Sequence, residues 1–149
     1  MYFIDRRKIE DTLTYMTEHM KLFNEKTEWP SEVEKLALER LTYNLIEGFI
    51  DIGNHMIDGF IMRDPGSYED IVDILVDEKV IPKDNEAGFK KIVQLRKVLV
   101  SQYLTIDHDK LYRTLKENQQ VIIDFPKQVR DYLEQELGPV SAFMPENHE

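Results

Sequence analysis

The sequence predicts an all-α fold, an antiparallel bundle of four to five helices. Apolar residues recur at spacings of three and four along most of the 149 residues, which is the period of an amphipathic helix. No segment long enough to form a strand alternates apolar and polar residues as a half-buried strand does. No internal repeat or low-complexity tract divides the chain. We therefore expect a single helical domain over residues 1–138, followed by a flexible tail over residues 139–149.

The first two predicted helices have clear starting signals. Asp5 is a candidate N-cap, and apolar residues at helical spacing follow it over residues 9–23. Trp29-Pro30-Ser31 breaks this helix, and Ser31-Glu32-Val33-Glu34 is a capping box for the next one. The second helix is expected to run to about Arg63. Its apolar residues cover so much of its circumference that it should lie at the centre of the bundle.

Turn signals separate three further helices. Asp64-Pro65-Gly66 suits a type II turn, and a short third helix should follow it. The fourth helix should begin near Asp84. The fifth should begin near Asp107, be kinked or broken at Pro126, and stop before Gly138-Pro139.

The composition narrows the classes of protein to consider. A hydrophobic content of 42% and a charged content of 32% exclude wholesale disorder. The formal net charge of −10 opposes nonspecific binding to nucleic acid or anionic lipid, so any RNA contact needs a local basic patch. The chain has no cysteine, no metal or phosphate-loop motif, no signal peptide and no run long enough to span a membrane. We expect a cytoplasmic protein without a metal, a cofactor or a membrane partner.

Arg96 interrupts a face of the fourth predicted helix that should be wholly apolar. Phe89, Val93, Arg96, Val100 and Tyr103 share that face at helical spacing. A guanidinium cannot lose its charge and is costly to bury alone, so Arg96 must meet a carboxylate, a phosphate or the solvent of an interface. An internal ion pair and a functional role both remain open.

A polar stripe on the second predicted helix offers partners for this arginine. Asn44, Glu47 and Asp51 belong to it, and short groups such as Asn and Asp favour fixed hydrogen bonds over a merely solvated helix face. Glu47 and Asp51 are the natural partners of Arg96 if the two helices pack together. A solvated face is the alternative interpretation.

Basic residues gather beside Arg96. Lys90, Lys91 and Lys97 flank it, and with a second copy across a twofold axis Lys91 and Lys97 are candidates for binding an RNA backbone. Ordinary surface lysines are the alternative.

The four histidines indicate no metal site. His55 is flanked by two aspartates at helical spacing, but a di-metal bundle needs Glu-x-x-His on two helices and the chain has none. We expect His19, His108 and His148 at the surface.

The segment Leu95-Arg96-Lys97-Val98-Leu99-Val100-Ser101-Gln102-Tyr103 resembles the Arg-x4-6-His-x-Tyr motif of the HepT-like branch of the HEPN superfamily. Residues 58–68, Ile106-Asp107 and Leu111-Tyr112 resemble a Firmicute-type subgroup of that family, and the likeness covers nearly the whole chain. The resemblance implies a compact helical bundle that forms a homodimer. It also implies a metal-independent endoribonuclease, in which the RNA 2′-OH attacks the adjacent phosphate. Such proteins are often toxins, neutralised by a nucleotidyltransferase that adds AMP to the motif tyrosine.

Carried over residue by residue, Arg96 matches the motif arginine and Tyr103 the tyrosine that accepts AMP, whereas Ser101 stands at the histidine position. Serine does not titrate near neutrality as imidazole does. Two functions therefore remain open. One is a toxin-antitoxin ribonuclease with Arg96, Ser101 and Tyr103 as catalytic residues, and the other is a noncatalytic dimer that binds RNA, a nucleotide or a protein. Arg96 and position 101 lie about 140° apart around an ideal helix, so a common site would combine two subunits.

Overall fold

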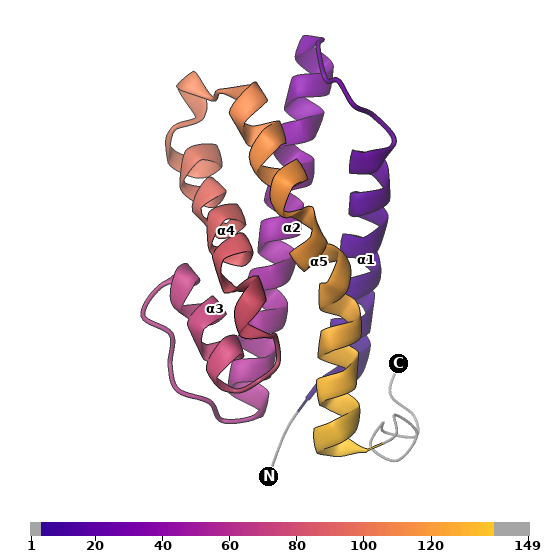
Figure 1. The fold of residues 1–149 in the computed structure, drawn as a ribbon, viewed down its shortest axis with the longest axis vertical. Helices are drawn as coiled ribbons and strands as arrows, with labels where there is room; N and C mark the ends of the chain where they lie inside the picture. Colours follow the sequence, from indigo (N-terminus) through magenta and orange to yellow (C-terminus); the bar gives the residue numbers. More distant parts are fainter. Residues whose placement is uncertain (1–3, 139–149) are drawn as a thin grey trace.

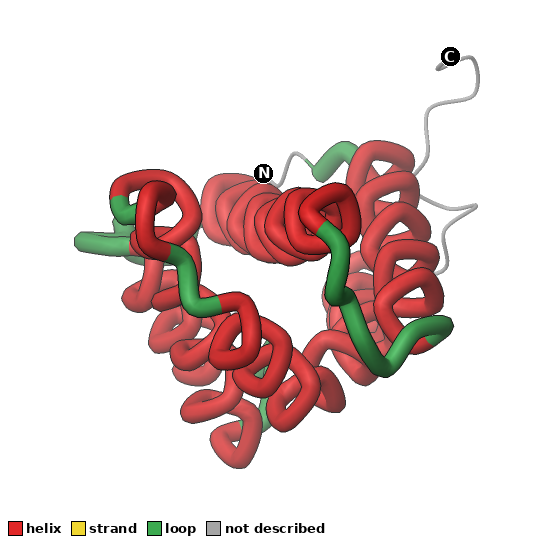
Figure 2. The backbone as a smooth tube through the Cα atoms, turned by 90° about the horizontal axis from the view of Figure 1, so that it is seen from above, coloured by secondary structure: helices red, strands yellow, loops and turns green. Residues whose placement is uncertain are grey.

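The computed structural model describes residues 4–138, and the regular structure in this range is helical throughout (Figure 1). The long helices alternate in direction, and a short one packs against two of them; seen end-on, they surround one common interior (Figure 2). The predicted all-α antiparallel bundle is confirmed, while the predicted tail, residues 139–149, lies outside the described residues. The elements are α1 (Arg6–Asn24), α2 (Glu32–Gly59), α3 (Tyr68–Asp77), η1 (Lys83–Asn85), α4 (Glu86–Ser101), η2 (Tyr103–Thr105) and α5 (His108–Leu137).

Local capping signals fix where the helices begin. The side chains of Asp5 and Asp107 accept hydrogen bonds from backbone amides in the first turns of α1 and α5. Ser31 and Glu34 form both bonds of the predicted capping box, at 3.1 and 3.0 Å. Each cap satisfies amides that have no partner inside the helix, which typically contributes about 1 kcal/mol.

Three phenylalanines in mutual ring contact join the centre of the bundle. Phe49 of α2, Phe89 of α4 and Phe125 of α5 are all buried. Their ring centroids are 4.5 Å apart for Phe49 and Phe89, 5.2 Å for Phe49 and Phe125, and 5.4 Å for Phe89 and Phe125. Aromatic pairs of this kind contribute about 0.5–1.5 kcal/mol beyond the area that they bury. The buried residues of α2 lie on most of its sides, so its predicted central position is confirmed.

The end of α2 differs from the prediction. The helix ends at Gly59 rather than near Arg63, because Ile61 adopts a φ of 56°, a left-handed conformation that cannot continue the helix. Gly66 has no positive φ, so the predicted type II turn, which requires one there, is wrong.

Asp70 holds this connection in place of the turn. Its carboxylate accepts two hydrogen bonds from Arg63, at 2.7 and 2.9 Å, and one from the amide of Gly66 at 2.9 Å. The Ser67 hydroxyl accepts from the Asp70 amide and caps α3. These bonds fix the start of α3, where Tyr68 lies.

A glycine on α2 allows α3 to pack closely. A Cβ atom at Gly53 would lie 2.5 Å from Cγ2 of Ile71, a branched side chain with little room to move. The close approach of the two helices therefore requires glycine at this position.

α5 is continuous through Pro126, so the predicted break does not occur. Pro126 is buried, and the ribbon changes direction near the middle of the helix (Figure 1). A proline removes one backbone hydrogen bond from the helix. The buried residues of α5 before and after Pro126 keep both halves of the helix packed on the bundle.

We expect the Asp70 anchor to fail in acid. The bond from Arg63, followed by the bond from Gly66, lowers the pKa of Asp70 from 3.8 to about 2. Because the pKa is lower in the folded state, the stabilisation is complete above about pH 4 and is lost as the pH falls through 2. Unfolding followed by circular dichroism should show wild type to be more stable than Asp70→Asn at pH 6, with the difference shrinking toward pH 2.

The exposed Asp64→Asn variant serves as the control, since no hydrogen bond or ion pair is recorded for Asp64 within residues 4–138. A difference between wild type and Asp70→Asn that stays constant from pH 6 to pH 2 would contradict the anchor.

Candidate functional site

Arg96 lies on the side of α4 that packs toward α2, where a carboxylate meets it. Its Nε donates a hydrogen bond to Oε2 of Glu47 at 2.7 Å, and the two side chains are 23% and 30% exposed. The bond to Glu47 raises the pKa of Arg96, so the guanidinium stays charged. The predicted pairing of Arg96 with Glu47 is confirmed. Asp51, the other expected partner, is exposed and makes no recorded bond to Arg96.

An aromatic ring covers the guanidinium. Cζ of Arg96 lies 4.5 Å from the ring centroid of Tyr68, at the start of α3. Sequence reasoning placed Tyr68 in the segment that resembles the family and missed this contact, because no local pattern places α3 against the C-terminal half of α4. Tyr68 and Glu47 together orient Arg96.

The pairing leaves most of the arginine's donors available. A guanidinium has five N–H groups, and Glu47 takes only the one on Nε. Among residues 4–138, no recorded hydrogen bond or ion pair involves Nη1 or Nη2 of Arg96. This edge has the planar fork that binds a phosphate or carboxylate through two parallel bonds.

The residues of the predicted polar stripe contact two different helices, α4 and α1. Glu47 faces Arg96, whereas the Asn44 amide lies 3.1 Å from the Tyr15 hydroxyl and 3.0 Å from Nε2 of His19. Asn44 therefore ties α2 to α1 and does not support Arg96. His19 was expected at the surface, but it is half-buried in this contact.

The end of α4 corrects the prediction for Tyr103. The helix stops at Ser101, and Tyr103 lies in η2, so the face shared by Phe89, Val93 and Arg96 does not continue to it. Ser101 is exposed and Tyr103 is 63% exposed. Ser101 lies about 7.5 Å along the axis from Arg96 and about 140° around it. One chain does not bring these two side chains to the same point.

The basic residues near Arg96 fall into two groups. Lys90 contacts Asp73 at 2.7 Å and Glu86 at 3.1 Å, and these bonds raise its pKa. Lys91 and Lys97 are exposed, and neither has a recorded ion pair within the described range. Lys91 lies about 140° around α4 from Arg96, beside α5.

The surface near the end of α4 is unusually apolar. A pocket of about 290 Å³ opens between α2 and α4, with Leu36, Tyr43, Leu99 and Val100 in its lining. Sequence reasoning placed Val33 in the apolar stripe of the central helix, but it is 75% exposed. We use the name apolar rim for five exposed residues at this end of the molecule: Val33, Leu36, Val100, Tyr103 and Leu104.

A contact between His108 and Glu39 lies beside the apolar rim. Nε2 of His108 is 2.6 Å from Oε2 of Glu39, and about three quarters of each side chain is covered. The prediction that His108 is exposed is therefore wrong, because the start of α5 packs against α2.

Residues 4–138 contain neither a candidate metal centre nor a candidate membrane-spanning helix. No three His, Asp or Glu side chains are grouped as metal ligands. No helix in this range combines the length and apolar character needed to cross a membrane.

Comparison with known proteins places the chain in a family. A family model described as Ribonuclease HepT-like matches residues 6–129. The Bacillus subtilis (strain 168) protein named "Putative RNase YutE" is 56% identical over 143 residues, which cover 96% of this chain and 99% of that protein. An Archaeoglobus fulgidus protein named "Putative RNase" is 26% identical over 129 residues, which cover 87% and 96% of the two chains.

A solved structure agrees with this placement. YutE from Bacillus subtilis, described there as a cytosolic protein of unknown function, superposes with a TM-score of 0.92 at 56% identity, over 96% of this chain and 100% of that chain. The expected resemblance is confirmed, and this chain belongs to the HepT-like ribonuclease family.

Proposed function

We propose that this protein is a cytoplasmic, homodimeric endoribonuclease that cleaves RNA without a metal ion, with Arg96 as its phosphate ligand. The observation that carries the proposal is the orientation of Arg96, which Glu47 holds through Nε while both Nη groups stay available. In the reaction, the RNA 2′-oxygen forms a bond to the adjacent phosphorus and the bond to the 5′-oxygen breaks. Water takes up the proton that leaves the 2′-hydroxyl and supplies one to the departing 5′-oxygen. Arg96 stabilises the charge that develops on the phosphate oxygens.

Ser101 and Tyr103 complete the proposed site from the partner subunit. The 140° separation on one helix keeps Ser101 away from its own Arg96, and a second copy removes that constraint. The Ser101 hydroxyl hydrogen-bonds the phosphate, and Tyr103 positions it. Lys97 and Lys91 hold neighbouring phosphates of the RNA.

The apolar rim supports the homodimer. Leu104 is 87% exposed, Val33 75% and Leu36 62%, and Leu36 and Val100 line the pocket between α2 and α4. Clustered exposed apolar side chains of this size mark interaction sites on protein surfaces. Burying them against a second copy would bring two α4 ends, and so two sets of Arg96, Ser101 and Tyr103, to one interface.

We also propose a toxin-antitoxin role for this protein. Tyr103 is 63% exposed in the single chain, and its hydroxyl has to lie at the open edge of the dimer interface for an enzyme that transfers nucleotides to reach it. We propose that a nucleotidyltransferase antitoxin adds AMP to Tyr103 and blocks the site with a bulky anion.

A noncatalytic dimer is the second candidate function. Ser101 favours it, because a missing general acid or base typically costs about 10²- to 10⁴-fold in rate. Such a protein keeps the arginine to bind RNA or a nucleotide, or the apolar rim to bind another protein.

The role of Arg96 predicts its effect on cleavage. Purified wild type should cut RNA in the presence of a chelator, and Arg96→Ala should lower the rate by about 10²- to 10³-fold, as expected for loss of one oxyanion ligand. Gel analysis of a labelled RNA measures this, with the exposed Arg7→Ala on α1 as the matched control. Intact RNA at high wild-type concentration, or an unchanged rate in Arg96→Ala, would overturn the nuclease proposal.

Restoring the family residue separates the two functions. If the scaffold is a weakened or silenced nuclease, Ser101→His should raise cleavage by about 10²-fold or more, with a rate that depends on pH near neutrality. Ser101→Asn, which has no titratable group, is the control. A noncatalytic module would show no cleavage in any of the three proteins.

The apolar rim predicts how dimerisation can be broken. Leu104→Glu places a charge where the interface is proposed, so light scattering should show a dimer for wild type and a monomer for this variant. Ile123→Glu on α5 changes an exposed apolar residue away from the apolar rim and should stay dimeric. A monomeric wild type at tens of micromolar would contradict the composite site.

A further inference from the structure

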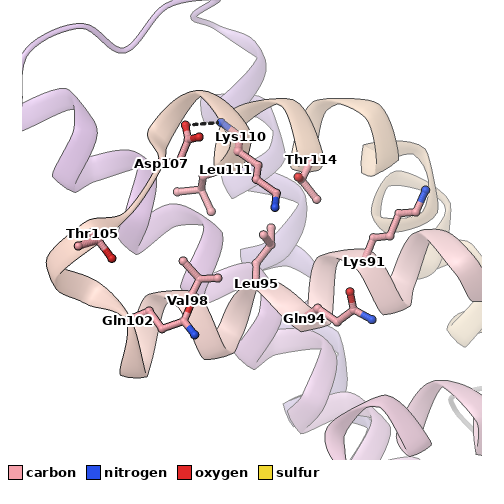
Figure 3. A pocket seen from close by; sticks show the side chains of 10 residues that line it. All are labelled: Lys91, Gln94, Leu95, Val98, Gln102, Thr105, Asp107, Lys110, Leu111 and Thr114. Carbon is pink, nitrogen blue, oxygen red and sulfur yellow. Dashed lines mark hydrogen bonds between the residues drawn. The ribbon is translucent and has the colours of Figure 1, made fainter.

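The structure contains a second candidate surface on the other side of α4. A groove of about 490 Å³ runs between α4 and the first turns of α5. Figure 3 shows Lys110 on α5 extending its ammonium group between the two helices toward Leu95, and Lys91 on α4 standing at the other end of the lining with its ammonium group pointing outward. Leu95, Val98 and Leu111 form its floor.

The charges in this groove are not balanced within the chain. In the part of the chain that the structure describes, neither Lys91 nor Lys110 has a recorded ion pair, whereas the adjacent Lys90 contacts two carboxylates. Asp107 is the one acidic residue of the lining, and its carboxylate accepts the backbone amide of Lys110 at 3.0 Å as the cap of α5. One ammonium group inside the groove and a second at its end, in a chain of net charge −10, favour an anionic ligand that extends along the groove.

The floor and the length of the groove restrict the class of ligand further. Leu95 is 7% and Leu111 2% exposed, so the floor is a packed apolar surface on which a flat ring can lie. The lining extends from Lys91 to Gln102 along α4, about 16 Å at 1.5 Å per residue, which exceeds what a single phosphate needs. Amides and hydroxyls, such as those of Gln102 and Thr114, add hydrogen-bonding groups along the walls.

We propose that the groove between α4 and α5 binds a short run of single-stranded RNA, with phosphates at Lys91 and Lys110 and a base or ribose on the apolar floor. This inference rests on the proposed function and extends it from the cleavage point to the flanking nucleotides. Single-stranded RNA fits because its unstacked bases can turn toward a protein surface, whereas a duplex keeps them inside. The groove lies away from the Nη edge of Arg96, so Lys91 and Lys110 hold the substrate and do not touch the reacting atoms.

Binding to an RNA that cannot be cut tests the groove separately from catalysis. A fluorescein-labelled 12-nucleotide single strand with 2′-O-methyl groups lacks the attacking hydroxyl, and fluorescence anisotropy measures its affinity for the full chain. Lys91→Glu/Lys110→Glu should bind at least 10-fold more weakly than wild type. Each phosphate contact contributes about −0.7 to the slope of log K against log salt for a single strand. The loss of two contacts should therefore make this slope shallower by about 1.4.

The matched control is Lys8→Glu/Lys21→Glu, which makes the same charge change at two exposed positions of α1. Equal losses in both double variants would mean binding to general charge and would overturn the groove. Unchanged affinity in the groove variant would also overturn it, even if wild type cleaves ordinary RNA. Groove-dependent binding without any cleavage would support the groove and reject the nuclease. Displacement of the RNA by polyglutamate at equal concentration of charge would overturn RNA as the ligand. Circular dichroism of each variant confirms folding.

Discussion

The contact between Arg96 and Glu47 is the constraint on which this surface depends. A permanent cation on α4 cannot enter the bundle without a partner, and α2 supplies one at 2.7 Å. A partly exposed ion pair contributes only about 0–1 kcal/mol to stability. Its main effect is therefore orientation, because one bond at Nε sets the direction of the remaining four N–H groups. The apolar core, and not this pair, holds the helices together.

Much of the fold was predictable because its signals are local. The caps at Asp5 and Ser31 each need only residues within one turn and form as expected, and the fifth helix begins beside Asp107 as predicted. The connection over residues 64–66 was not predictable, because Asp70 on the next helix captures the Gly66 amide that a turn would otherwise have oriented. Sequence patterns therefore predict contacts within one helical turn well. They predict poorly the contacts that a side chain from another element makes.

The same distinction explains the site. Helical spacing on two segments was enough to propose that Glu47 meets Arg96, since each face could be read separately. Tyr68 reaches the guanidinium only because Gly53 lets α3 approach α2 and Asp70 fixes its first turn. Tyr103 was misplaced because extrapolating one helical face assumed that α4 continues beyond Ser101. The position where a helix stops has to be known before residues beyond it can be assigned to a face.

The aromatic cluster has a consequence for how α4 and α5 can move. Phe89 lies in the first turn of α4 and Phe125 in the second half of α5, so both helices are clamped at one level near the base of the groove. The opposite end meets η2, which has no buried residue. Leu95 and Leu111 stay buried between α4 and α5, so the freedom to adjust is confined to the short connection between Gln102 and Asp107. One end of the groove is thus fixed by packed aromatic rings, whereas the connection at the other end can adjust. This arrangement suits polymers whose bases differ in size.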